Sequence, residues 1–401
     1  MMATDLDVGQ RVAMFRARRG LTQEELAGLA GISLSFMKKI ESGERAVTKF
    51  ALLVRLAAAL GVDDLRELTG VPLPLAPTDG GRHPATAEVR AALLDYSLPG
   101  TAPELDDLGT EIEAAWSTWH ESSPWRYANV GQRLPTLIRS ARAAEVMHQG
   151  SQHRRARREA SKLYLLVRTW TKWVGECELS LLAADRAATS AREADDPDLS
   201  AAASWNVAMV LSAEGHTSEA RAVVRRAIEV LRPRVTDGGR RRMAVYGALH
   251  LLGAAEAARA HQPGEVRRLA DVAATIAERT GETTYYRMMF GPTNVALYRV
   301  TAAVEMGRIS DAITVAERLS LESLPSVERR LTGYLDTARC YAVRRNDIGA
   351  LHMLQRVRAA SIEELRYNRT AHAILDGLES HAKPSIRSDL VPLREAAGLP
   401  G

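Results

Sequence analysis

The 401-residue chain has little of what builds secreted, membrane-spanning or zinc-holding proteins. Its two cysteines, Cys177 and Cys340, lie far apart in sequence, so neither a disulfide framework nor a cysteine-based zinc site is expected. No apolar run approaches the ~20 residues of a spanning helix. Acidic Asp5 and Asp7 precede the first amphipathic stretch, where a signal segment would be basic and then apolar. We therefore expect a cytoplasmic protein without membrane association.

Aromatic residues are also scarce, at 5% of the chain, while alanine and leucine are abundant, which favours helices over sheets. The chain contains no phosphate-cradling glycine loop, no pair of zinc ligands at helical spacing and no strand–glycine–helix unit. We therefore predict an all-α protein that is not an enzyme and needs no cofactor. A chain of this length favours two or three domains.

Positive charge is concentrated near the N-terminus. The whole chain carries a net charge of +4. Residues 8–49 contain eight lysines and arginines against four glutamates, so this segment carries the entire net charge and the remainder is neutral. A local positive field of this kind suits a polyanionic partner.

Composition divides the chain into three parts. Residues 1–70 have the spacing of five short helices. Residues 71–105 form a linker rich in proline and glycine that contains one helix, within "ATAEVRAALLDY". Residues 106–401 contain paired helical stretches. The predicted domains are therefore a head, a linker and a helical array.

Capping and turn residues define the helices of the head. Thr22 begins a capping box, and Gly31 permits a left-handed turn. Ser33 caps the next helix, whose Met37 and Ile40 share an inward face. The sequence "LTQEELAGLAGISLSFMKKIESGE" therefore predicts two short helices joined by a tight turn.

This N-terminal pattern resembles the XRE family, the helix-turn-helix class of Cro and the phage repressors, over about residues 8–62. It combines "RxxRGLTQEELA", a glycine turn, a capped helix, "IESG" and a trailing "LLVRLAAALGV". The resemblance implies that a homodimer binds double-stranded DNA at an operator with two half-sites arranged as an inverted repeat. It also implies an internal ion pair between Arg16 and Glu41, for which two solvated charges are the alternative.

The helix after Ser33 is the expected recognition helix, because the early residues of such a helix reach base edges. Lys38 and Lys39 suit guanine edges or phosphates. Leu34 contacts a thymine methyl group or, alternatively, covers Phe36 within the protein. The full set of predicted DNA-binding residues is Gln23, Ser33, Leu34, Ser35, Lys38, Lys39, Ser42 and Arg45.

Residues beside the recognition helix complete this set. Gln23 contacts a phosphate or supports a recognition side chain, while Ser42 and Arg45 suit backbone phosphates.

The helical array shows a recurring spacing. In three places a small or apolar residue late in one helix is followed by a turn and then by a small residue early in the next helix. The three sets are Ala208, Leu211, Gly215 and Ala220; Val300, Ala303, Gly307 and Ala312; and Ala338, Tyr341, Arg345 and Ala350. The spacing favours stacked helix pairs over an irregular bundle. It resembles the tetratricopeptide repeat in a degenerate form, so we predict a tetratricopeptide-like α-solenoid.

A helical array behind such a head resembles the architecture of the peptide-pheromone receptors of Gram-positive bacteria, which act in quorum sensing. The resemblance implies a concave face, lined by the first helix of each pair, that binds an extended ligand. Asn206 and Asn294 fall on that face, and an amide offers a peptide backbone both a donor and an acceptor. Capping or hydrogen bonding between helices is the alternative role for each.

The segment "TTYYRMMFGPTNVALYR" gathers tyrosines, methionines and a phenylalanine in a chain poor in aromatics. It forms either the floor of a ligand groove or core packing between repeats. Tyr285, Arg287 and Phe290 therefore join the two asparagines as predicted ligand-binding residues. The same two interpretations apply to three tryptophans, Trp170, Trp173 and Trp205.

The sequence thus predicts a DNA-binding transcriptional regulator whose solenoid dimerises and senses a peptide or small-molecule effector. Two alternatives retain the same fold. In one, the solenoid is a protein-interaction platform without a small ligand. In the other, the protein is an adaptor whose head no longer binds DNA.

Overall fold

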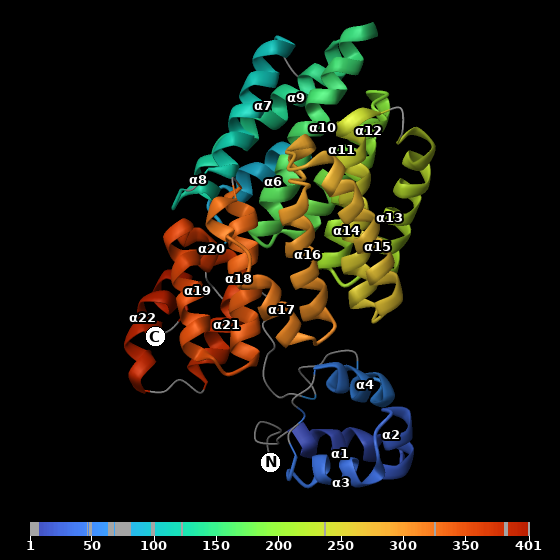
Figure 1. Cartoon of the computed structure of the whole chain (residues 1–401), viewed down its shortest axis with the longest axis vertical. Helices are drawn as coiled ribbons and strands as arrows, with labels where there is room; N and C mark the ends of the chain where they lie inside the picture. Colours follow the sequence, from blue (N-terminus) through green and yellow to red (C-terminus); the bar gives the residue numbers. More distant parts are fainter. Residues whose placement is uncertain are drawn as a thin grey trace. The chain divides into compact units, whose positions relative to one another are not determined.

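The structure, a computed structural model, describes residues 8–45, 47, 50–62, 68, 82–97, 101–121, 123–235, 238–324, 326–380 and 384–399. These residues form helices and loops without any strand, which confirms the predicted all-α fold (Figure 1). The chain divides into two compact units, Met1–Asp79 and Gly80–Gly401, each with its own hydrophobic core. None of the described helices combines the length and apolar character needed to cross a bilayer.

The first unit is a small helical bundle. Each described helix contributes a fully or almost fully buried residue to one core, including Val12, Leu26, Met37 and Leu56. The fifth helix predicted for the head lies outside the described residues, apart from Leu68. The described helices are α1 (Val8–Arg18), α2 (Gln23–Leu29), α3 (Leu34–Glu41) and α4 (Phe50–Leu60).

The predicted turn between α2 and α3 is present. The backbone N–H of Glu25 donates to Thr22 Oγ1 at 3.2 Å, and the backbone N–H of Thr22 donates to Glu25 Oε2 at 2.7 Å, which completes the capping box. Gly31 has φ +64°, a conformation that suits glycine. Ser33 then accepts the backbone N–H of Phe36 at 3.2 Å and starts α3.

The second unit begins before the boundary that composition indicated. The helix predicted within the linker forms α6, and it packs on α9. Val89, Ala92 and Leu93 on one face of α6 are buried in the same core as Leu105. Because this face needs apolar cover, α6 is part of the second unit.

The helices of the second unit follow one another through short turns. They are α6 (Thr86–Leu94), α7 (Leu105–His120), α8 (Arg126–Gly131), α9 (Leu134–Met147), α10 (Gly150–Trp173), α11 (Cys177–Glu193), α12 (Pro197–Ala213), α13 (Thr217–Leu231), α14 (Gly239–Arg259), α15 (Pro263–Thr280), α16 (Pro292–Glu305), α17 (Ile309–Ala316), α18 (Val327–Val343), α19 (Asp347–Ala360), α20 (Ile362–Tyr367), α21 (Arg369–Glu379) and α22 (Pro384–Ala397). Three 3-10 turns join some of them: η1 (Arg232–Arg234), η2 (Tyr285–Arg287) and η3 (Leu321–Ser323).

The helix pairs predicted from the recurring spacing are confirmed as α12 with α13, α16 with α17 and α18 with α19. Their small residues lie where two helices approach closely: Ala208, Ala220, Ala312, Ala338 and Ala350 are all fully buried. The helices α10 with α11 and α14 with α15 form two further pairs. The result is the predicted tetratricopeptide-like solenoid.

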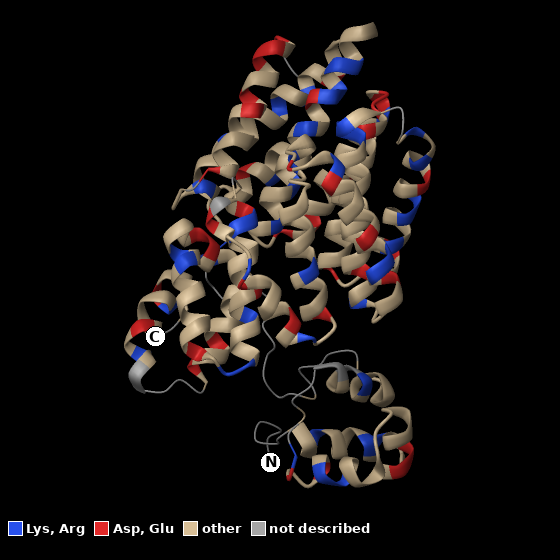
Figure 2. Cartoon of the chain, in the orientation of Figure 1, with Lys and Arg blue, Asp and Glu red and all other residues tan. Residues whose placement is uncertain are grey.

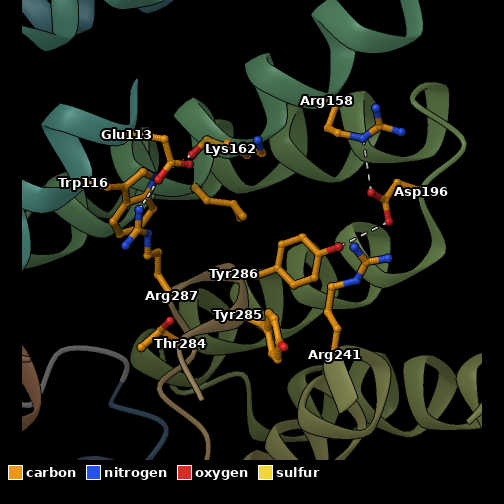
Figure 3. A pocket seen from close by; sticks show the side chains of 11 residues that line it. Glu113, Trp116, Arg158, Lys162, Asp196, Arg241, Thr284, Tyr285, Tyr286 and Arg287 are labelled. Atoms are coloured by element: carbon orange, nitrogen blue, oxygen red, sulfur yellow. Dashed lines mark hydrogen bonds and ion pairs between the residues drawn. The ribbon is translucent and has the colours of Figure 1, made fainter. Parts of the chain in front are cut away.

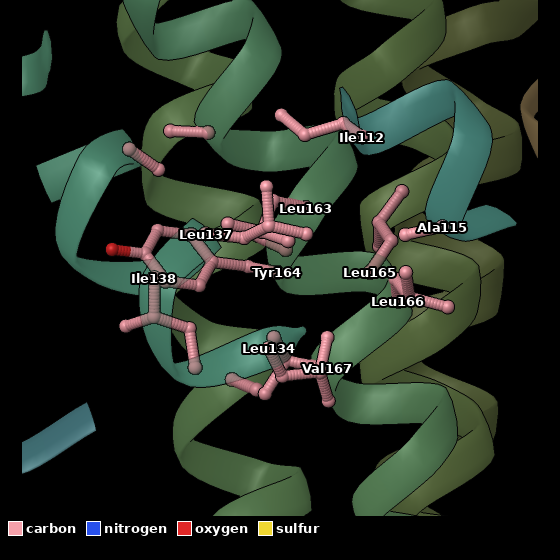
Figure 4. Packing of buried hydrophobic residues seen from close by; sticks show 14 of the residues in the cluster. Ile112, Ala115, Leu134, Leu137, Ile138, Leu163, Tyr164, Leu165, Leu166 and Val167 are labelled. Carbon is pink, nitrogen blue, oxygen red and sulfur yellow. The ribbon is translucent and has the colours of Figure 1, made fainter. Parts of the chain in front are cut away.

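The first turns of the solenoid pack on a large core around α10 (Figure 4). Leu163 and Leu166 on α10 meet Leu137 and Ile138 from α9 and Ile112 from α7, and all five side chains are buried. Such close packing fixes the axis of α10, which also supplies polar residues to the inner side of the solenoid.

Buried polar contacts join the early helices of the second unit to its late ones. Arg126 at the start of α8 donates to Glu364 Oε2 of α20 at 2.6 Å, and both side chains are essentially inaccessible to solvent. The guanidinium also lies 4.3 Å from the ring centre of Trp119. The backbone N–H groups of Tyr127 and Ala128 donate to the neighbouring Glu363 at 2.6 and 3.1 Å. The array therefore curls until α8 touches α20 (Figure 1).

Loss of this ion pair should destabilise the second unit strongly. We expect Arg126→Met to lower the free energy of unfolding by about 3–5 kcal/mol, because Glu364 would remain buried without its partner. All six tryptophans lie in the second unit, so urea unfolding followed by tryptophan fluorescence reports on that unit. The control is Arg155→Met, which removes an exposed pair with Asp106 and should cost less than about 1 kcal/mol. Equal effects of the two variants would contradict the assignment.

Candidate functional site

The outward face of α3 carries most of the predicted DNA-binding residues. Leu34, Ser35, Lys38, Lys39 and Ser42 line one shallow surface hollow, together with Glu44. Both lysines and Ser35 are exposed, and Leu34 is half-buried at the rim. Figure 2 shows basic residues along α1 and α3 and acidic residues on α2. The face is therefore polar and basic, with one apolar side chain.

An ion pair holds α3 against α1, as the resemblance implied. Arg16 donates to both carboxylate oxygens of Glu41, at 2.7 and 2.9 Å. Gln23 Nε2 donates to Glu41 Oε2 at 2.7 Å, and Arg16 also donates to the backbone oxygen of Leu21 at 2.8 Å. Burial acts to raise the pKa of Glu41, but the hydrogen bonds from Arg16 and Gln23 and the charge of Arg16 outweigh it, so the pKa is lowered. Glu41 thus stays ionised and joins three elements.

Three members of the predicted set have partners within the protein. Gln23 donates to Glu41 at the end of α3, so in this structure it contacts the side chain that pairs with Arg16. The hydroxyl of Ser33 caps α3, and the hydroxyl of Ser42 donates to the backbone oxygen of Lys39 at 3.3 Å. Arg45 is exposed beyond the end of α3. Phe36 packs against the core of the unit, whereas Leu34 borders the surface hollow.

The contact between Arg16 and Glu41 should stabilise the first unit measurably. We expect Glu41→Gln to lower local stability by about 1–3 kcal/mol, because it removes hydrogen bonds to a charged group. The measurement is amide hydrogen exchange of α1 and α3 by mass spectrometry in the full chain, since the first unit has no tryptophan or tyrosine. Glu24→Gln, an exposed glutamate on α2, is the control and should leave exchange unchanged.

The contribution of the contact between Arg16 and Glu41 to stability depends on pH. The folded-state pKa of Glu41 is depressed, so its contribution is fully present above the unfolded pKa of about 4.3. It is lost as the pH falls through the lower folded pKa. The difference between wild type and Glu41→Gln should therefore be largest at neutral pH and shrink in acid.

The second unit contains two neighbouring hollows on the inner side of the solenoid. The inner hollow, of about 290 Å³, is lined by the first helices of the pairs, α10, α12, α14, α16 and α18, with additions from α7, η2 and the start of α21. The strap hollow, of about 520 Å³, lies between α7, α10, α14 and the segment Gly281–Gly291, which we call the strap (Figure 3). The first helices therefore line the inner side of the solenoid, as expected.

The strap borders both hollows. Tyr286 and Arg287 line each of them, and both adopt positive φ values, 48° and 60°. A tyrosine or arginine in this region stores strain of order 1–3 kcal/mol. Tyr286 donates to Asp196 at 3.5 Å and Arg287 forms an ion pair with Glu113, as the dashed lines in Figure 3 mark. Side-chain contacts thus hold the strap across the inner side.

The structure separates the five predicted ligand-binding residues. Asn206 lines the inner hollow, while its amide Nδ2 donates to the backbone oxygen of Ala202 at 2.9 Å. Tyr285 and Arg287 line the strap hollow, and Arg287 also reaches the inner one. Asn294 is buried outside the residues that line either hollow, and among the described residues its Oδ1 has no hydrogen-bond partner.

Phe290 requires a correction. Its ring is buried in the core of the second unit against Gly247, where no space for a Cβ exists, and it lines neither hollow. The alternative interpretation, core packing, therefore applies to this residue. The tryptophans divide in the same way, since Trp173 and Trp205 line the inner hollow and Trp170 is buried in the core.

Charged residues of the inner hollow were missed by sequence reasoning. Arg168 and Lys172 on α10 line it, as do Glu328 and Arg329 on α18. Glu328 accepts hydrogen bonds from the indoles of Trp119 and Trp173 at 3.0 and 3.3 Å. Burial acts to raise the pKa of Glu328, yet the charge of Arg329 and these contacts hold it at about 2. The only signal in the sequence was the spacing of four between Arg168 and Lys172, which places them on one face of a helix.

Comparison with known proteins gives the class of the first unit. Residues 7–68 match the family described as Helix-turn-helix domain. No curated protein matches the chain. The chain is similar to PlcR of Bacillus thuringiensis, solved with a peptide and DNA, at 15% identity over 68% of this chain and 95% of that one, with a TM-score of 0.29. It is also similar to apo ComR, a competence regulator of Streptococcus vestibularis, at 11% identity over 98% of each chain, with a TM-score of 0.23.

The family match covers fewer than half of the residues, so it describes the first unit and not the whole chain. That unit, with its capped α2, glycine turn and α3, carries a helix-turn-helix domain.

Proposed function

We propose that this protein is a DNA-binding transcription regulator. The observation that carries the proposal is the outward face of α3 in a helix-turn-helix domain, where Ser35, Lys38 and Lys39 are exposed around Leu34. In such domains the recognition helix enters the major groove and its early residues reach base edges. The exposed lysines supply the positive charge that contact with phosphates or guanine edges requires.

The regulator acts as a homodimer on an inverted repeat. One recognition helix of eight residues reaches few bases, so sequence-specific affinity requires two half-sites. A twofold protein on a DNA site with the same symmetry presents both helices equivalently. The second unit is the larger one and contains the inner hollow. We infer that this unit supplies both the dimer contacts and an effector site.

Selection from random DNA tests this function. The full chain, mixed with a library of random fragments at low salt, should enrich a single inverted repeat. Absence of any enriched sequence would exclude a sequence-specific regulator and would favour the adaptor alternative.

Lysine variants distinguish phosphate contacts from base contacts on the enriched DNA site. Lys39→Ala should weaken binding, and Lys38→Ala likewise. If the lysine contacts a phosphate, affinity falls about equally for all sequences and the salt slope flattens by about 1. If it reads a guanine, the loss is about 1–3 kcal/mol and preference relaxes at one base pair. Arg225→Ala, which removes an exposed charge from the second unit, is the matched control and should bind normally.

Leu34 should recognise the methyl group of a thymine. Replacing that thymine by uracil removes only the methyl and should cost wild-type protein about 0.8 kcal/mol, roughly a fourfold loss of affinity. Leu34→Ala should bind both sites equally, because it no longer buries the methyl group. A uracil effect that persists in the variant would assign the contact to another residue.

A further inference from the structure

The inner hollow contains more positive than negative charge. Six of its lining residues are cationic: Arg168, Lys172, Arg259, Arg287, Arg329 and Arg339. Three are acidic: Glu305, Glu328 and Asp336. Some of these charges are paired, since Arg339 lies 3.4 Å from Glu305 and Arg259 forms an ion pair with Glu256. Arg287 forms an ion pair with Glu113. The remaining cations of the hollow are Arg168 and Lys172 on α10 and Arg329, which is adjacent to Glu328 on α18.

In the part of the chain that the structure describes, the direct contacts of Arg168 and Lys172 are with neutral groups. Arg168 is almost fully buried, and its guanidinium donates to the backbone oxygen of Asn206 at 3.3 and 3.4 Å and to Thr169 Oγ1 at 3.4 Å. The ammonium of Lys172 lies 4.4 Å from the ring centre of Trp173. Arg168 is buried and Lys172 is half-buried. A cation held away from water without a paired carboxylate is costly, so this pair forms a site that an anion would stabilise.

The indole of Trp205 adds an aromatic surface to the same wall. Trp205 lines the inner hollow and is nine-tenths buried, and its ring centre lies 5.8 Å from the guanidinium carbon of Arg168. The donors that favour an occupant rich in acceptors are therefore Arg168 and Lys172.

The rest of the wall suits an apolar body. Trp116, Trp173, Tyr298, Leu252 and Leu297 line the inner hollow. Its volume of about 290 Å³ is at the lower end of small-molecule sites and is too small for an extended peptide of several residues. The strap separates it from the neighbouring hollow through Tyr286 and Arg287.

We propose that the inner hollow binds a small molecule with an apolar or aromatic body and one anionic group, a carboxylate or a phosphate, which Lys172 and Arg168 hold. This inference rests on the proposed role of the second unit as the effector-binding part of the regulator. The anion supplies the acceptors that Arg168 and Lys172 lack. The body packs against the tryptophan and leucine wall.

The protonation of Lys172 supports this assignment. Burial, and then the charge of Arg168, lower the pKa of Lys172 to about 8, while burial lowers that of Arg168 to about 10. The charged groups that act on Lys172 are Arg168 on its own helix, Arg259 on α14, and Glu328 and Arg329 on α18. With pKa values of about 2 and about 10, Glu328 and Arg168 both stay charged at neutral pH. Near pH 8, therefore, Lys172 is the member of this group that loses its proton.

The test is a titration of the full chain with three probes that share a phenyl ring. Phenylpropanoate carries a carboxylate, phenyl phosphate carries a phosphate, and phenylpropanol is the neutral counterpart. Binding is followed by tryptophan fluorescence, because Trp173 and Trp205 line the hollow, and by calorimetry. We expect at least one anion to bind about tenfold tighter than the alcohol or better. The tighter of the two anions identifies the anionic group.

Variants on α10 locate the site. Lys172→Met should reduce anion affinity about tenfold or more, and Lys172→Arg should preserve the preference for anions over the alcohol. Arg155→Met, an exposed charge on the same helix outside both hollows, is the matched control and should bind like wild type. Urea unfolding of each variant shows whether it folds.

The pH dependence gives an independent readout. Wild-type affinity for phenylpropanoate should be constant below about pH 8 and fall as the pH rises through that value, because neutral Lys172 no longer attracts the carboxylate. The fall should be absent in Lys172→Met and for phenylpropanol.

Three results would overturn the inference: equal affinity for phenylpropanol and both anions, equal loss in Lys172→Met and Arg155→Met, or no saturable binding of any probe at millimolar concentration. Operator binding by Lys172→Met without probe is measured separately. If operator binding is normal but no anion binds, the inference about the inner hollow is wrong and the proposed function stands. If no operator is enriched, the proposed function is lost instead.

Discussion

A buried ion pair between Arg126 and Glu364 joins an early helix of the array to a late one, and the helices between them line the inner hollow. In a solenoid each repeat contacts mainly its neighbours, so the first and last helices have no inherent reason to meet. Here Arg126 at the start of α8 donates to Glu364 of α20. The backbone N–H groups of the first turn of α8, which have no acceptor within their own helix, donate to the adjacent Glu363. Separating these helices would leave charges unpaired in the core. Glu328 on α18 adds a second link through the indoles of Trp119 and Trp173.

This closure gives the two hollows different electrostatic properties. In the strap hollow the cations have carboxylate partners: Arg158 lies 3.3 Å from Asp196, and Arg287 pairs with Glu113. In the inner hollow Arg168 and Lys172 face neutral oxygens and an aromatic ring. Arg168 is almost fully buried, so its charge is little screened by solvent. The strap hollow is therefore held together by its own ion pairs, whereas the inner hollow favours an anionic ligand.

In the helix-turn-helix unit, too, polar contacts between residues far apart in sequence hold a helix in place. Glu41 at the end of α3 binds Arg16 and Gln23, and Ser33 caps its start. Both ends of the helix are thus fixed by polar contacts on its inward side. Lys38 and Lys39 remain exposed on the outward side, where a partner can reach them.

The sequence by itself determined the elements whose causes are local. Caps at Thr22 and Ser33, the glycine turn and the alanine spacing of the pairs each act within a few residues, so the helix-turn-helix and the solenoid were predictable. The ligand-facing residues were not: Asn206 reached the hollow as predicted, yet Phe290 packs in the core against Gly247. Little in the sequence indicated that Arg168 and Lys172 line a hollow, because charged side chains on a helix usually face the solvent. Only the tertiary structure decided that Arg168 and Lys172 line the same hollow as α18, with Arg168 buried and Lys172 half-buried, since that depends on contacts between residues more than two hundred positions apart.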